Sequence, residues 1–184
     1  IGEPPATRGY TPSVFELLPK LLERSGTSDK GSITGFYTVL VDGDDMDEPI
    51  SDTVRGILDG HVILSRKLAQ KYHYPAIDVL SSISRLANRV SGAKSREAAA
   101  RIRRMMAVYD DAEDMIAVGA YQKGSNPAID ESMEHHPKIE NFLCQEVGDT
   151  APIGETLAQL AAVADIEIPP EEAEHADPAP SYDS

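Results

Sequence analysis

The segment Ile33–Val41, with the sequence ITGFYTVLV, is the feature that most constrains the fold. It is rich in β-branched, aromatic and aliphatic residues and contains no charged side chain. A strand that is apolar along both faces must be covered on both faces, which occurs mainly in parallel sheets flanked by helices. The segment therefore predicts a buried strand in a parallel sheet.

Helix and strand signals alternate around this segment. A helix is predicted to begin near Thr11-Pro12, because proline is tolerated in the first turn of a helix. Further helices are predicted at about 51–58, 65–71 and 82–90, with a second short strand at 76–80. Such alternation is typical of an α/β domain.

The pattern changes after Gly92. Residues 95–119 lack strand signals and carry apolar side chains at helical spacing, and shorter helical segments follow up to residue 164. From residue 166 onward Pro, Glu, Ala and Asp dominate, a composition typical of disorder. The expected organisation is an α/β part at 1–92, an all-helical domain at 93–165 and a disordered acidic tail at 166–184.

The net charge of −14 is concentrated in two short segments. Asp42–Asp52 contains six acidic residues and no basic one, and Asp165–Ser184 contains seven acidic residues and no basic one. The rest of the chain is nearly neutral. This distribution disfavours non-specific binding to nucleic acid or to anionic lipid.

The single cysteine, Cys144, excludes a disulfide within the chain and fits a reducing cytoplasm. No surrounding motif would activate its thiol, so we expect a buried structural cysteine. The chain also lacks an apolar run long enough to span a bilayer as a helix.

Several long motifs carry a resemblance to a known family. Residues 31–45 (GSITGFYTVLVDGDD), 57–66 (ILDGHVILSR) and 74–78 (YPAID) resemble type III export ATPases and, more distantly, the catalytic subunits of rotary ATP synthases. Residues 2–10 (GEPPATRGY) and 119–127 (GAYQKGSNP) are similar to the flagellar branch of these ATPases. The resemblance covers about residues 1–164.

This resemblance implies a fold and a function. The fold would be the C-terminal part of a RecA-like P-loop ATPase core, followed by a small helical domain. The intact protein would form a homohexameric ring that hydrolyses ATP with Mg²⁺ and energises flagellar protein export. It would work in the cytoplasm, at the inner face of the cell membrane.

The same resemblance implies partners: other copies of the chain, a central coiled-coil stalk protein, export chaperones and substrates, and the membrane export gate. Two alternatives remain open. One is the ATPase of a virulence secretion system, and the other is a catalytically inactive interaction module.

The phosphate-binding loop of such ATPases does not occur in this sequence. The motif G-x-x-x-x-G-K-[ST] has no match; Gly119 and Gly124 have the glycine spacing, but Ser125 stands where lysine is required. The resemblance implies that the Mg²⁺ ligands and the water-polarising residue lie outside this chain. We therefore expect the chain alone to be inactive.

Three residues are assigned to a nucleotide site by the resemblance. Arg85 resembles the arginine finger that acts on the neighbouring subunit, where a fixed guanidinium stabilises charge developing on the phosphoryl oxygens. Tyr74 resembles the tyrosine on which adenine stacks, and Phe142 resembles an aromatic residue that closes the same pocket. The alternatives are a structural arginine that bridges helices and a half-buried core tyrosine.

The resemblance also suggests that Asp44, Asp45, Asp47 and Glu48 face a central channel and contact a basic stalk. A solvated loop is the alternative. A calcium loop is excluded because Met46 and Thr53 occupy ligand positions. His135-His136 has no convincing partner ligands and is expected at the surface, so the sequence predicts no metal site.

Overall fold

The computed structural model describes residues 2, 4, 9–41 and 45–174, except for the side chains of residues 173 and 174. The chain divides into two compact units, residues 1–61 and 62–184. Asp44 lies outside the described residues. None of the helices in the described part is long and apolar enough to cross a membrane.

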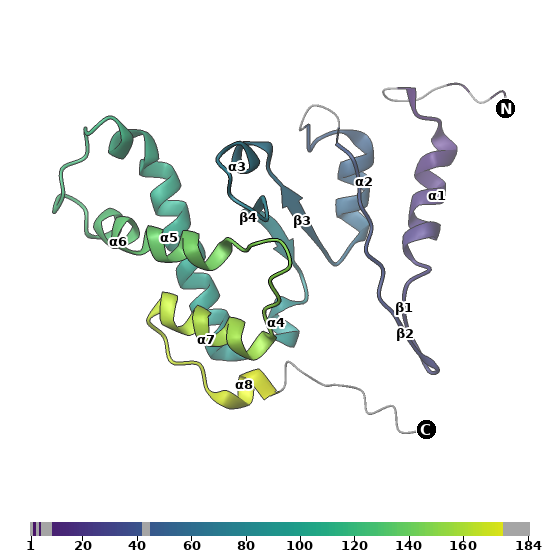
Figure 1. Ribbon diagram of the computed structural model, residues 1–184. Helices are drawn as coiled ribbons and strands as arrows, with labels where there is room; N and C mark the ends of the chain where they lie inside the picture. Colours follow the sequence, from purple (N-terminus) through teal and green to yellow (C-terminus); the bar gives the residue numbers. More distant parts are fainter. Residues whose placement is uncertain (1, 3, 5–8, 42–44, 175–184) are drawn as a thin grey trace. The chain divides into compact units, whose positions relative to one another are not determined.

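The described part of the first unit contains two helices and a small sheet (Figure 1). Helix α1 (Pro12–Leu22) begins after Thr11 with proline in its first turn, as predicted. Strands β1 (Gly26–Ser28) and β2 (Gly31–Ile33) pair antiparallel. Helix α2 (Pro49–Ile57) packs against α1 and buries Val54.

The parallel sheet predicted from Ile33–Val41 is not present among the described residues. Only Ile33 belongs to a strand, and the described strands form two separate two-stranded sheets. Phe36 is 95% exposed and Leu40 is 94% exposed. A strand that is apolar on both faces needs neighbouring strands and covering helices, and the described chain supplies neither along residues 34–41.

The second unit begins with an α/β segment. Strand β3 (Gly60–Leu64) pairs with β4 (Ile77–Ser84), and helix α3 (Arg66–Gln70) connects them. The Ser65 hydroxyl accepts a hydrogen bond from the Leu68 N–H and caps α3. Strand β4 runs past its predicted end and is followed by the short helix α4 (Ala87–Val90), so the helix predicted at 82–90 begins later than expected.

Three helices form the core of the second unit. The long helix α5 (Ala93–Ala117) packs against α6 (Pro127–Leu143) and α7 (Ile153–Ala164), which also contact each other (Figure 1). Their buried side chains form one cluster: Ala98, Ile102, Met105, Ile139 and Ala164. The helical character predicted for this region is confirmed.

The prediction of disorder from residue 166 is wrong for the first part of the tail. Ile166 and Ile168 pack against the helical core, and residues Pro170–Glu174 form the short helix α8. Composition alone suggested disorder. However, these two isoleucines bury apolar surface against the helical core, and this burial holds the chain to the core. Residues 175–184 lie outside the described part.

Candidate functional site

Tyr74 lies in the connection between α3 and β4, and its side chain is 50% exposed. The Tyr74–Pro75 peptide bond is cis. The Tyr74 carbonyl oxygen accepts a hydrogen bond of 2.9 Å from the backbone N–H of Gln145, directly after α6. The backbone at Tyr74 is therefore tied to the helical core while its ring remains accessible.

Phe142 lies in the last turn of α6 and is half-buried. Because Gln145 follows three residues later, the Tyr74–Gln145 hydrogen bond brings the two segments predicted to hold adenine side by side. Among the described aromatic pairs, the Tyr74 and Phe142 rings do not stack on each other. The structure thus juxtaposes their backbones, and their roles remain predictions.

Arg85 is exposed in the bend between β4 and α4. This surface position is compatible with action on a neighbouring molecule. Another arginine is held firmly by the chain itself: the Arg103 guanidinium donates hydrogen bonds to the carbonyl oxygens of Val79 and Leu80, at 2.6 and 3.1 Å. Arg103 therefore links α5 to β4. Arg85 directly follows the last residue of the same strand.

Among the described residues of the acidic loop, Asp47 is exposed and Glu48 is buried. The Asp47 side chain is 97% exposed and lies 3.8 Å from the Arg55 guanidinium. Asp45 accepts a hydrogen bond from the backbone N–H of Asp47. Glu48, in contrast, is 5% exposed, and its carboxylate caps α2 by accepting from the Ser51 N–H. Glu48 therefore caps α2, whereas the exposed Asp47 is accessible to a partner.

A cleft in the described part of the second unit has a volume of about 330 Å³ and lies between the α3–β4 segment and helices α5 and α6. Lys71 and Glu113 line it and form an ion pair at 2.8 Å. Their hydrogen bond raises the pKa of Lys71 and lowers the pKa of Glu113. Tyr74, Phe142 and Arg85 do not line this cleft.

The prediction that the His135-His136 pair lies at the surface is wrong for His135, which is buried, while His136 is half-buried. His135 is 6% exposed and its Nε2 lies 2.9 Å from Asp165 Oδ2. That hydrogen bond lowers the pKa of Asp165. The His136 ring stacks on Tyr109 with centroids 3.7 Å apart. Sequence spacing along α6 did not reveal these contacts, because their partners lie on other elements.

Two consecutive parts of the chain match the models of two protein families. Residues 1–84 match the ATP synthase alpha/beta family, nucleotide-binding domain. Residues 92–162 match the T3SS EscN ATPase C-terminal domain. The two matches follow each other directly, so they define a chain of the ATP synthase alpha/beta class that carries the helical domain of secretion ATPases.

The most informative relative is the flagellum-specific ATP synthase of Treponema pallidum, which is 56% identical over 167 residues. The chain belongs to the family of flagellar and type III secretion ATPases. The alignment covers 91% of this chain but 37% of the relative, so the chain spans little more than a third of that protein's length.

Solved structures agree with this assignment. Assembled EscN, the ATPase of the enteropathogenic E. coli type III secretion system, superposes with a TM-score of 0.86 at 42% identity, over 89% of this chain and 40% of EscN. EscN in complex with its central stalk EscO gives a TM-score of 0.80 at the same identity, over 89% of this chain and 38% of that EscN chain.

Proposed function

We propose that this chain is the C-terminal portion of a homohexameric ATPase that energises flagellar protein export by ATP hydrolysis. The observation that carries the proposal is the 56% identity to a flagellum-specific ATP synthase across nearly the whole chain. The 42% identity to EscN makes a virulence secretion ATPase the second candidate. The proposed domains are residues 1–92 and 93–165, followed by the tail.

In the intact protein, residues 1–92 would complete a RecA-like core. The exposed apolar segment 34–41 supports this part of the proposal. Phe36 and Leu40 each leave almost their whole side chain in water, which costs the hydrophobic free energy that their burial would provide. Strands and helices contributed by the rest of the core would cover this segment and convert it into a buried strand.

The proposed adenine pocket consists of Tyr74 and Phe142. The hydrogen bond between the Tyr74 carbonyl and the Gln145 N–H supports it, because this bond fixes one aromatic segment relative to the other. The half-exposed Tyr74 ring has a free surface for a purine, and stacking on an aromatic face favours planar bases. Phosphates and Mg²⁺ would be held by residues that this sequence does not contain.

The proposed catalytic residue is Arg85, an exposed residue that would reach the nucleotide of the neighbouring subunit. Charge grows on the phosphoryl oxygens during transfer, and a positively charged fork stabilises it. Because the residue serves another subunit, hydrolysis would require the assembled ring.

The proposed contact with a central stalk involves Asp44, Asp45 and Asp47. EscN forms a complex with a central stalk, which supports a stalk partner here. Glu48 would act indirectly by capping α2 and fixing the end of the loop. Export chaperones, export substrates and the gate at the inner face of the cell membrane complete the proposed partners, with the protein itself in the cytoplasm.

ATP hydrolysis by the purified chain tests one part of this proposal. Because the sequence lacks a phosphate-binding loop, the chain alone should hydrolyse ATP no faster than a protein-free blank. Full-length protein that contains this chain should hydrolyse ATP with a specific activity that rises with concentration as the ring assembles. Turnover by the chain alone that persists through further purification would contradict the proposal, as would concentration-independent activity of the full-length protein.

A further inference from the structure

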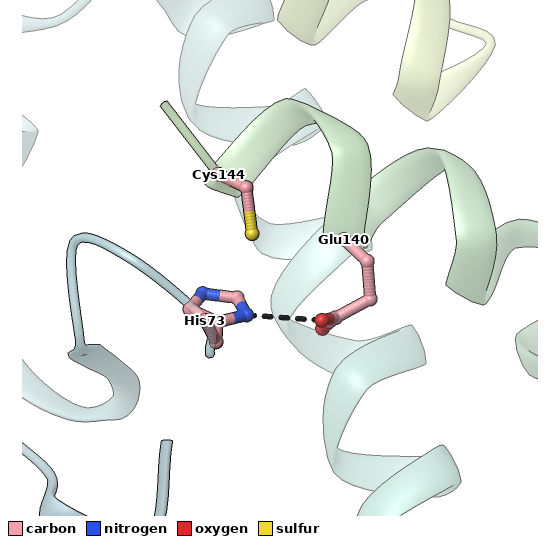
Figure 2. A group of neighbouring side chains, drawn as sticks. All are labelled: His73, Glu140 and Cys144. Atoms are coloured by element: carbon pink, nitrogen blue, oxygen red, sulfur yellow. Dashed lines mark hydrogen bonds and ion pairs between the residues drawn. The ribbon is translucent and has the colours of Figure 1, made fainter. Parts of the chain in front are cut away.

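Three potential metal ligands from two distant parts of the second unit meet beside Tyr74. His73, Glu140 and Cys144 each place one ligand atom so that all three atoms lie within 4.8 Å of one another (Figure 2). We propose that these residues form a binding site for a divalent cation of the zinc class. The sequence predicted no metal site, because His73 is far from the other two residues along the chain.

The backbone holds the three ligands in place. Glu140 and Cys144 are four residues apart at the end of α6, where the Cys144 N–H donates to the Glu140 carbonyl at 3.0 Å. Residues with this spacing lie on one face of a helix. The His73 N–H donates to the Leu68 carbonyl at 3.1 Å, which fixes the turn after α3. A site built on such elements needs little rearrangement to bind a metal.

The distances suit a metal ion after a small adjustment. His73 Nδ1 lies 2.9 Å from Glu140 Oε2, with a proton between them. With zinc bonds of about 2.0–2.3 Å and tetrahedral angles, ligand atoms would be roughly 3.3–3.8 Å apart. The metal would replace that proton and increase the distance between these two atoms by less than about 1 Å, while the Cys144 Sγ, within 4.8 Å of both, would move closer by at most about 1.5 Å. Side-chain rotation is sufficient for a shift of this size.

The donor set selects the type of metal. Imidazole nitrogen, thiolate sulfur and carboxylate oxygen together are ligands that Zn²⁺ accepts, whereas Ca²⁺ and Mg²⁺ prefer sites made of oxygen. A neutral imidazole with one thiolate and one carboxylate would also balance the charge of a divalent ion. Three protein ligands leave a fourth coordination position for water.

The surroundings give the ion access to this site. Cys144 is exposed, which corrects the prediction of a buried structural cysteine, while His73 is 6% exposed and anchors the inner side.

A bound metal would join the residue before Tyr74 to the residue two positions after Phe142. If the proposed function holds, the metal would thereby fix the two sides of the adenine pocket; metal binding itself does not depend on that function.

Cobalt binding provides a direct test on the purified, reduced 184-residue chain. Co²⁺ should bind with a stoichiometry of one per chain and give a thiolate-to-cobalt charge-transfer band together with the visible bands of a tetrahedral ion. Zn²⁺ should displace Co²⁺ and abolish both signals. Zn²⁺ should also raise the melting temperature, because a ligand that binds the folded state stabilises it.

Variants separate this site from accidental metal binding. Cys144→Ser should abolish the charge-transfer band, and Cys144→Ser, His73→Ala and Glu140→Gln should each weaken Zn²⁺ binding by about tenfold or more. The matched controls His61→Gln and Glu134→Gln should bind Zn²⁺ as the parent chain does, since neither residue belongs to the cluster. Circular dichroism establishes that each variant is folded, and Cys144→Ser, at an exposed position, keeps the test informative if His73→Ala unfolds.

The proposal is overturned if the parent chain gives no charge-transfer band with Co²⁺. It is equally overturned if Cys144→Ser retains the parent chain's Zn²⁺ affinity and its Zn²⁺-induced rise in melting temperature. Loss of ATP hydrolysis in a full-length variant would instead concern the proposed function. The metal readouts are therefore independent of that function.

Discussion

The Glu172 carboxylate accepts a hydrogen bond of 2.8 Å from the backbone N–H of Ser95, in the first turn of α5. It also accepts from the Lys94 N–H at 2.9 Å and from the Ser95 hydroxyl at 2.6 Å. Helix α5 has no side-chain cap of its own, because glycine occupies the N-cap position. A residue from the acidic tail therefore satisfies backbone donors that a local cap normally serves.

Removing the charge of Glu172 should destabilise the second unit. In Glu172→Gln the amide is a weaker acceptor and loses the attraction between a carboxylate and a helix N-terminus. We expect a lower urea midpoint than in the parent chain at neutral pH. Glu171→Gln is the matched control, because Glu171 is exposed and no hydrogen bond involving its side chain is described. Equal midpoints for Glu172→Gln and the parent chain would contradict the capping role.

The same contact should depend on pH. The hydrogen bonds from Ser95 and from the Lys94 N–H lower the pKa of Glu172 from its ordinary value of 4.5. Since the folded pKa lies below the unfolded one, the stabilisation is present above pH 4.5 and is lost as the pH falls through the folded value. The difference in urea midpoint between the parent chain and Glu172→Gln should therefore shrink from about pH 7 to about pH 3. A difference that is constant over this range would show that ionisation of Glu172 is not its cause.

Gly92 is required by the same contact. A β-carbon at this position would lie 2.0 Å from the Glu172 Cδ, so Gly92→Ala should displace the carboxylate. We expect Gly92→Ala to lower the urea midpoint, and the double variant with Glu172→Gln to lose less than the sum of the single losses. Gly154→Ala is the control, because its β-carbon would meet nothing within 4 Å. If the double variant loses the full sum of the two single losses, Gly92 acts independently of the contact between Glu172 and α5.

The capping contact also illustrates what the sequence could and could not predict. Apolar spacing in α5 predicted the helix, since residues such as Ile102 and Met105 recur on one face and are buried. The composition of the tail indicated disorder, because composition does not record that Glu172 meets a helix end. Contacts between residues far apart in the sequence carry no local signal.

The candidate site shows the same limit. The motif containing Tyr74 could be found from its resemblance to known ATPases, but its hydrogen bond to Gln145 required the structure. Glu48 was predicted to contact a partner, and its burial as a cap was not foreseen. Pro49 indicates that a helix begins here, but glutamate is not a preferred N-cap residue, so the cap could be found only in the structure.

Replacement of Tyr74 tests the adenine pocket in the full-length protein. Tyr74→Ala should weaken ATP binding by about 1–3 kcal/mol, the range found when an aromatic side chain that stacks on a base is removed. Tyr74→Phe should be mild, because the ring does the stacking. Calorimetric titration with a non-hydrolysable ATP analogue measures both, and Tyr72→Ala, at a neighbouring exposed tyrosine, is the control. Equal damage from Tyr74→Phe and Tyr74→Ala would indicate a role for the hydroxyl instead.

Replacement of Arg85 tests catalysis between subunits. In assembled full-length rings, Arg85→Ala should lower turnover by roughly 10³ or more while nucleotide affinity remains nearly unchanged. Arg89→Ala is the matched control, since Arg89 is also exposed and lies in α4, four residues further along the chain. Turnover by Arg85→Ala rings at the parent rate would leave Arg85 with a structural role only.

Neutralising the acidic loop tests the stalk contact. If Asp44, Asp45 and Asp47 attract a basic stalk, their triple replacement by Asn should weaken stalk binding and stalk-stimulated turnover while basal hydrolysis is retained. For the parent protein, stalk affinity should fall as added salt shortens the Debye length below about 10 Å, and the triple variant should show a smaller dependence.

The control for this last variant must carry the same change in charge. Asp110, Asp111 and Asp114 are three exposed acids on α5, so their replacement by Asn removes the same number of charges away from the loop. Stalk affinity should remain at the parent level in this control if the location of the charges matters. If both triple variants lose affinity equally, the stalk responds to net charge alone. If neither loses affinity at low salt, the loop is solvated and has no part in binding the stalk.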